Sequence, residues 1–154
     1  MAKPKSEHLI FRVDGEAYAL SVETVREVVE YGRITSIPLS DPSMRGLINL
    51  RGAGVPVVDL RLLLGLWPAD ATRDTSIIIV DAPAGAGETS LLGAIADSVC
   101  EVTSFGALEP APRFGSRAPL EYIAGICRKG DGFVVVLDAE RLFAGLRIEE
   151  GVVA

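Results

Sequence analysis

The chain has 154 residues, enough for one domain with a buried core but too few for a second catalytic domain beside it. Its net charge is −6, with 15 Lys and Arg scattered among 21 acidic residues, which argues against DNA or RNA as the main partner and favours other proteins. Apolar residues make up 49% of the sequence, an ordinary value for a folded soluble protein.

The first residues, MAKPKSEH, lack the apolar core of a secretory signal, and no run approaches the roughly 20 apolar residues of a membrane span. We therefore expect a cytoplasmic protein. Cys100 and Cys127 both lie in apolar surroundings, which predicts two buried thiols in a reducing compartment and no disulfide.

Residues 8–20 contain two apolar stretches around Asp14 and Gly15, a dipeptide typical of a tight hairpin. Ser21 then has the side chain of a helix cap, and valines follow at helical spacing. The sequence therefore predicts a strand, a turn, a strand and a short helix over residues 21–29. Extended structure and a surface loop with two prolines follow.

The next stretch, GLINLRGAGVPVVDLRLLLG, predicts a second hairpin. Two apolar runs, 46–51 and 55–60, flank a small connector at 52–54. Asp59 is placed to cap a short helix, and Gly65 can take the left-handed conformation that ends one.

In the second half of the chain, apolar and β-branched runs predict further strands at 76–80, 122–128 and 133–137. The glycine-rich loop 82–88 lacks the Gly-Lys-Ser/Thr of a phosphate-binding loop, so we expect a plain flexible loop. Residues 106–120 form a proline-rich connection.

The chain contains a weak internal repeat. Residues 46–59 match 125–138 without a gap, and 25–28 resemble 99–102. Each copy has about five short strands, enough for a small closed barrel whose edges are protected. We expect one domain over 8–145, with the pseudo-repeat around 15–65 and 90–144, a flexible N-terminus at 1–7 and a tail at 146–154.

Residues that would support catalysis or metal binding are scarce. His8 is the only histidine and lies in the N-terminal approach, expected to be mobile, and the two cysteines have no metal-ligand spacing. Asp59 and Asp138 occupy equivalent repeat positions, which helix capping explains better than a carboxylate pair. We expect no catalytic residue, no metal and no cofactor; an enzyme or a small-ligand-binding barrel is the least favoured alternative.

One combination is specific: Asn49-Leu50-Arg51-Gly52 followed by Val55-Pro56-Val57-Val58-Asp59-Leu60-Arg61. Together with the order of elements from Leu9 to Phe143, it resembles the CheW-type coupling domain of bacterial chemotaxis. The resemblance implies a mainly β fold of two intertwined SH3-like five-stranded barrels with short helices.

The resemblance also implies a function. A CheW-type protein is a non-enzymatic adaptor that couples chemoreceptors, the methyl-accepting chemotaxis proteins, to the regulatory domain of a CheA-type histidine kinase. It is recruited to receptor arrays at the inner face of the membrane without inserting into it. In such families one subdomain meets the kinase, the other helps build rings, and the receptor hairpin lies in the groove between the barrels. The family also serves pathways for pili, surface motility or second messengers, which stay open as alternatives.

Matching the family position by position implies partner-binding roles for Val25, Glu27, Gly46, Arg51 and Val102. The residues themselves leave two questions open. The two valines suit either an apolar docking groove or the core. Arg51 suits either a partner carboxylate or a salt bridge within its own fold, whereas Gly46 at a strand start favours a structural need.

Overall fold

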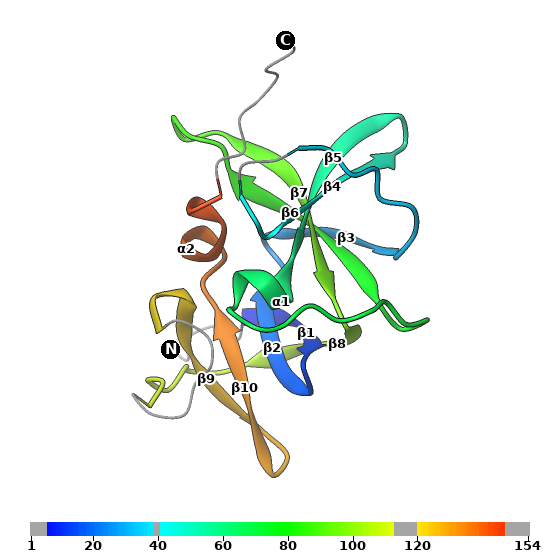
Figure 1. Ribbon diagram of the computed structural model, residues 1–154. Helices are drawn as coiled ribbons and strands as arrows, with labels where there is room; N and C mark the ends of the chain where they lie inside the picture. The colour runs from blue at the N-terminus through cyan, green and yellow to red at the C-terminus, as the bar shows by residue number, and fades with distance from the viewer. Residues whose placement is uncertain (1–5, 39–40, 113–119, 147–154) are drawn as a thin grey trace.

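Two five-stranded sheets form the architecture that the computed structural model gives for residues 6–38, 41–112 and 120–146 (Figure 1). Most of the described residues lie in strands, and the few helical segments are short. This confirms the predicted mainly β class with two five-stranded units. The predicted N-terminus at 1–7 and tail at 146–154 lie almost entirely outside the described residues, as do 113–119 of the proline-rich connection.

Barrel A is our name for the sheet built from both ends of the chain. Its strands, in spatial order, are β8 (Ser98–Phe105), β1 (Ser6–Val13), β2 (Glu16–Ser21), β10 (Gly132–Leu137) and β9 (Ile123–Lys129). Because β2 pairs in parallel with β10, the N-terminal hairpin and the C-terminal strands share one sheet.

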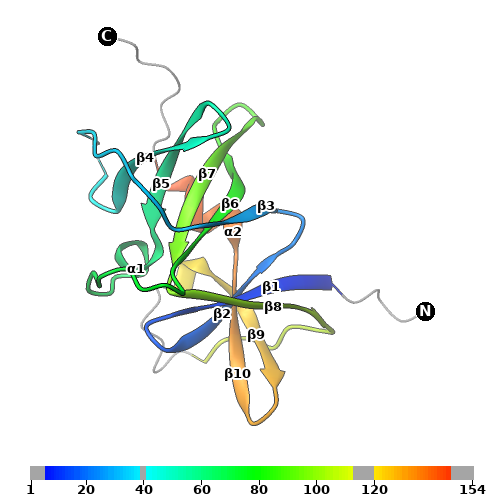
Figure 2. The ribbon, with the colours of Figure 1, turned by 90° about the vertical axis from the view of Figure 1, so that its right-hand side faces the viewer.

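Barrel B is the sheet built from the middle of the chain. Its strands, in spatial order, are β3 (Val25–Glu30), β6 (Ser76–Pro83), β7 (Thr89–Ala96), β5 (Ala53–Asp59) and β4 (Met44–Leu50). The chain enters barrel B after β2 and returns to barrel A after β7, so the two barrels are intertwined (Figure 2).

The two barrels repeat one pattern of pairing. The two edge strands β3 and β8 carry β-bulges at equivalent positions. The bulge in β3 lies between Val25 and Glu27, and the bulge in β8 lies opposite Ile10 and Phe11 of β1. The chain beyond β3 and beyond β8 then reaches the far edge of its own sheet, through the single bridges Thr35↔Leu47 and Glu109↔Ile126. These contacts bring the two edges of each sheet together, as in a small closed barrel. The counterpart of β6 and β7 is the N-terminal pair β1 and β2, which the matched residues 25–28 with 99–102 and 46–59 with 125–138 did not include.

The helix predicted over residues 21–29 is wrong. Residues 22–24 form a turn in which Thr24 N–H donates to the Ser21 carbonyl (3.0 Å). Strand β3 follows and pairs antiparallel with β6, from Val25↔Val80 to Glu30↔Ser76. The valines favour extended structure because their branched side chains pack well on a pleated surface, and this tertiary pairing overrides the helical spacing.

The hairpin predicted around 52–54 is confirmed, but its turn is one residue earlier. Arg51 and Gly52 form a two-residue turn with φ of 50° and 88°, and Ala53 begins the next strand by pairing with Leu50. The Asn49 side-chain oxygen accepts from Gly52 N–H (2.7 Å) and fixes this turn. A two-residue turn with both φ positive matches the right-handed twist of the strands that it joins.

Both predicted helix caps are confirmed. Helix α1 (Leu60–Leu63) begins at Asp59, whose side chain accepts from Arg61 N–H, and helix α2 (Ala139–Ala144) begins at Asp138, whose side chain accepts from Arg141 N–H. Gly65 follows α1 with φ +79°, the left-handed conformation expected of it. A short 3-10 helix, η1 (Leu120–Tyr122), precedes β9.

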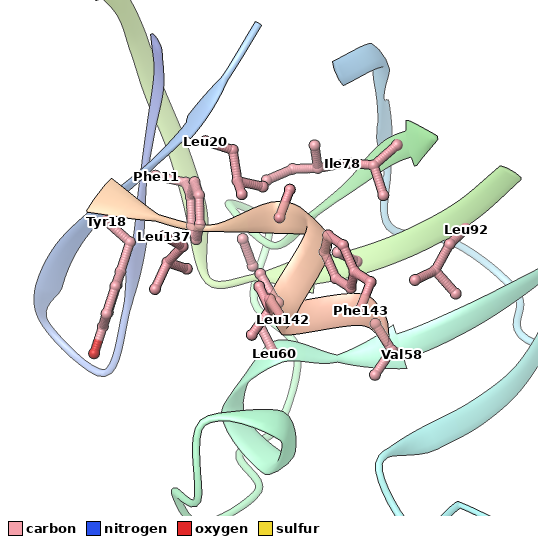
Figure 3. Close-up of a cluster of buried hydrophobic side chains, with 14 of the residues drawn as sticks. Phe11, Tyr18, Leu20, Val58, Leu60, Ile78, Leu92, Leu137, Leu142 and Phe143 are labelled. Carbon is pink, nitrogen blue, oxygen red and sulfur yellow. The ribbon is translucent and has the colours of Figure 1, made fainter. Parts of the chain in front are cut away.

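The main hydrophobic core lies between the barrels and belongs to both. Figure 3 shows Phe11 and Leu20 of barrel A, Ile78 of barrel B, and Leu142 and Phe143 of α2 in one cluster. Smaller clusters fill each barrel, around Ile10, Cys127 and Val134 in barrel A and around Ile48, Val57 and Ile79 in barrel B. The junction is thus packed with side chains through most of its depth.

Burying the carboxyl group of Asp59 leads to a prediction about pH. Burial is the main cause that raises the pKa of Asp59, and the N–H of Arg61 opposes it. A carboxyl with a raised folded-state pKa is most favourable to folding below its ordinary pKa, and stability falls as the pH rises through the raised value.

We expect Asp59→Asn, which keeps the capping oxygen, to reduce this fall, and Asp59→Ala to lower the free energy of unfolding by about 1 kcal/mol. Urea unfolding between about pH 4 and pH 8 measures both effects. Asp138→Asn is the matched control at the other cap, and an Asp59→Asn variant with unchanged pH dependence would contradict the prediction.

Candidate partner-binding surface

Two exposed valines mark where the shared core meets the surface. Val28 of β3 pairs with Ile78, and Val102 of β8 pairs with Leu9. Cross-strand partners point to the same face of a sheet, and both Ile78 and Leu9 belong to the shared core. Val28 (41% exposed) and Val102 (55% exposed) therefore extend the inter-barrel apolar face to its margin. We call this margin, with edge strands β3 and β8, the seam.

Val25 and Val102 lie in different surroundings. Val25 is half-buried and packs against the shared core, as does Val99, its counterpart in the repeat. Val102 is exposed, and its counterpart is Val28. Sequence reasoning missed Val28, although the match of 25–28 with 99–102 already aligned it with Val102.

Arg51 makes a local ion pair with Glu27, one of the two roles that the sequence allowed. Its Nη2 donates to Glu27 Oε1 (2.7 Å) and its Nη1 to Oε2 (3.3 Å), a two-point contact between the β4–β5 turn and β3. The hydrogen bond with Glu27 is the main cause that raises the pKa of Arg51, which stays charged. The Arg51 side chain is nevertheless 72% exposed, so its outer face is open to a partner.

Barrel A has a corresponding ion pair, which sequence reasoning missed. Glu101 of β8, the counterpart of Glu27, pairs with Lys129 of β9, and Lys129 also lies 3.4 Å from the Thr103 hydroxyl. The internal repeat could have revealed it, because the match of residues 25–28 with 99–102 aligns Glu27 with Glu101. On each edge strand an acid therefore precedes an exposed valine, and the two point to opposite faces: Glu27 and Glu101 pair with residues of their own barrel's cluster, whereas the valines face the seam.

Gly46 has a structural reason to be glycine. Its φ is +146°, and a Cβ added there would lie 2.1 Å from the backbone oxygen of Thr35. Gly125, its counterpart, would place a Cβ 2.8 Å from the backbone oxygen of Glu109. Both glycines lie where the chain crosses to close its barrel, which is a close approach that no side chain fits.

The groups that might carry chemistry have structural roles. His8 is buried in β1 with its ring 5.5 Å from that of Phe105, so the expectation of a mobile histidine is wrong. Cys127 is buried, and burial is the main cause that raises the pKa of its thiol. Cys100 is exposed, contrary to expectation, because it occupies the bulge of an edge strand.

The described ranges contain no cluster typical of a metal site and no orphaned buried polar group. No group of three or more His, Cys, Asp or Glu side chains there is arranged to hold a metal ion, and no buried side-chain nitrogen or oxygen is left without a partner. Among the same residues, no helix has the length and apolar character needed to cross a membrane.

Comparison with known proteins gives one consistent result. Residues 7–147 match the family model described as the CheW-like domain. The chain is 29% identical over 140 residues to the chemotaxis protein CheW of Klebsiella aerogenes, covering 90% of this chain and 81% of that protein. It is 26% identical over 126 residues to the protein FrzA of Myxococcus xanthus, covering 81% and 76%. The crystal structure of the scaffolding protein TtCheW from Thermoanaerobacter tengcongensis is similar with a TM-score of 0.77 and 31% identity, covering 93% of this chain and 90% of that one.

The close approach at Gly46 predicts a large effect of one methyl group. We expect Gly46→Ala to lower the free energy of unfolding by about 3 kcal/mol, because strain from positive φ adds to a clash with backbone that cannot move aside. Chemical unfolding measures the loss. Gly54→Ala in the adjacent strand is the control, since a Cβ there would meet only the Leu47 side chain at 3.7 Å. Equal stability of the two variants would refute this account of Gly46.

Proposed function

Because this chain belongs to the CheW-like domain family, we propose that it is a non-enzymatic scaffold that couples chemoreceptors to a CheA-type histidine kinase. It acts in the cytoplasm, at receptor arrays on the inner face of the membrane. In this role it carries out no reaction of its own and changes kinase activity by holding receptor and kinase in a fixed geometry.

The seam is the observation that carries this proposal. It presents one exposed valine on each of two edge strands, Val28 on β3 and Val102 on β8, and the ion pairs of Glu27 and Glu101 lie on the other face of the same strands. The tip of a receptor is a helical hairpin, and an amphipathic helix needs an apolar strip for its own apolar side chains and charged groups beside that strip. The seam offers the apolar strip, and its two edge strands carry the charged groups on their other face.

A second pathway remains a candidate because one of the relatives is the protein FrzA rather than a protein named CheW. In that case the same scaffold serves a chemosensory pathway that controls pili, surface motility or second-messenger synthesis. The surfaces involved are the same, and only the identity of receptor and kinase differs.

Co-sedimentation tests the proposal directly. We expect the protein to sediment with membranes that carry a receptor cytoplasmic fragment, and to retain the kinase regulatory domain in the pellet. Val102→Asp is expected to weaken receptor binding about tenfold, since a charge placed in an apolar contact is costly. Its unfolding midpoint should stay nearly unchanged because Val102 is exposed.

Phe133→Asp is the matched control for Val102→Asp. Phe133 is equally apolar and similarly exposed (53%), but it lies on the β9–β10 hairpin, which projects away from barrel B (Figure 1). It should leave receptor binding intact. If the folded parent protein binds neither receptor nor kinase domain, the proposal is rejected.

Exchanging the charges of the Glu27–Arg51 pair separates a local role from a direct contact. We expect Glu27→Arg and Arg51→Glu each to weaken partner binding and the double exchange to restore it, because the two side chains already satisfy one another. Each single change should leave the unfolding midpoint nearly unchanged, because exposed ion pairs contribute little to stability. Calorimetric titration with each partner measures the binding. A double exchange as weak as Arg51→Glu would instead place Arg51 in direct contact with the partner.

A further inference from the structure

The chain returns from barrel B to barrel A through a single residue. Strand β7 ends at Ala96 and strand β8 begins at Ser98, so Asp97 alone joins the two sheets. The other crossing, from β2 to β3, uses the three residues 22–24. A change in the angle between the barrels must therefore be accommodated by the backbone at these two places, and most sharply at Asp97.

The N–H and the carboxylate of Asp97 contact both barrels. Its N–H donates to the Arg12 carbonyl (2.9 Å), and its Oδ2 accepts from the N–H of Asp14 (2.8 Å), both in the first hairpin of barrel A. The same carboxylate accepts two hydrogen bonds from Arg61, from Nε at 3.0 Å and from Nη2 at 2.6 Å. Arg61 belongs to α1, which directly follows β5 of barrel B.

Arg61 has further contacts that fix its position. Its Nη1 lies 3.4 Å from Asp14 Oδ1 and donates to the Trp67 carbonyl (3.3 Å). Its side chain is only 17% exposed. One guanidinium thus connects the turn of barrel A, the crossing residue and the helix of barrel B, in a fork geometry that a carboxylate matches at two points.

The internal repeat shows that this contact is not a requirement of the barrel itself. Asp59 corresponds to Asp138, and two residues further on Arg61 corresponds to Glu140. Helix α2 forms with an acid at that position, so a barrel and its capped helix need no arginine there. The arginine occurs in the one helix that lies beside the crossing residue.

The shared core and the Arg61–Asp97 pair make different contributions to the junction. Apolar contacts are strong in sum but not directional, so a packed core allows small sliding movements of one sheet over the other. A two-point hydrogen-bonded ion pair is directional and tolerates little movement. The pair therefore supplies the angular restraint that the core lacks.

We propose that Asp97 is the hinge between the barrels and that Arg61 locks it, so that both are positioning residues that set the width of the seam between β3 and β8. The consequence for binding rests on the proposed function, because a receptor hairpin at the seam touches both barrels. The angular restraint itself does not rest on that function.

Residual dipolar couplings of backbone N–H groups test the hinge without any partner. In the parent protein, couplings from β3–β7 and from β1, β2 and β8–β10 should fit one common alignment tensor. In Arg61→Met the two sets should require tensors with different principal axes. Arg61→Lys keeps the charge but loses the two-point contact of the guanidinium, so the two tensors should differ by a smaller angle. This variant also replaces Arg61→Met in the test if Arg61→Met does not fold.

Arg26→Met is the control, because it removes an ion pair of similar length, Arg26 Nε to Asp81 Oδ2 at 2.7 Å, that lies wholly within barrel B. It should keep one common tensor. Couplings of Arg61→Met and Arg61→Lys that both fit the parent orientation would overturn the proposal.

Binding supplies the second readout. We expect Arg61→Met and Asp97→Ala to weaken binding of a receptor cytoplasmic fragment about tenfold, since the seam is no longer preorganised. Affinity for the kinase regulatory domain, which by resemblance needs one barrel only, should stay within about twofold of the parent. Equal loss for both partners would overturn a positioning role. If the parent binds neither partner, the proposed function fails, and the dipolar couplings still decide whether Arg61 locks the hinge.

Discussion

The apolar core between the two barrels is the constraint on which the rest of the structure depends. Among the described residues, the shared cluster contains 20 buried residues and each barrel's own cluster contains six, so most of the burial that stabilises this fold lies at the junction. Without the other barrel, each would keep only its own six-residue cluster. The bulges, the crossing segments and the close approaches at Gly46 and Gly125 all serve to bring two small sheets into that contact.

The candidate binding surface is a by-product of the same core. Each sheet turns one face toward the junction, and on the edge strands that face continues beyond the point where the other barrel covers it. Val28 and Val102 are the residues left uncovered there, and on the other face of the same strands Glu27 and Glu101 pair with Arg51 and Lys129 of their own barrels. Apolar side chains at the margin of a core are already fixed by their buried neighbours, so a partner meets a surface with little freedom left to lose.

The sequence was sufficient where structure is decided locally. The Asp14–Gly15 turn, the caps at Asp59 and Asp138 and the repeat of two β units all follow from nearby residues or from the chain's likeness to itself. Sequence-based prediction was wrong where pairing with a distant strand determines the local structure. The valines of β3 follow a helical spacing, and only pairing with β6 makes them a strand. The Glu27–Arg51 pair joins residues 24 positions apart, and no pattern in one sequence reveals it.

The split origin of barrel A has a consequence for how the chain folds. Barrel B is continuous in sequence, so its strands can pair with neighbours that a ribosome has released only shortly before. The hairpin of β1 and β2 emerges first, yet its parallel partner is β10, with Tyr18 beside Val135. We therefore expect this hairpin to wait with one edge exposed until the last strands arrive, and such long-range pairing is slow to form and open to wrong partners in the meantime. The order of synthesis thus runs against the order of assembly, and the final strands of the chain complete its first ones.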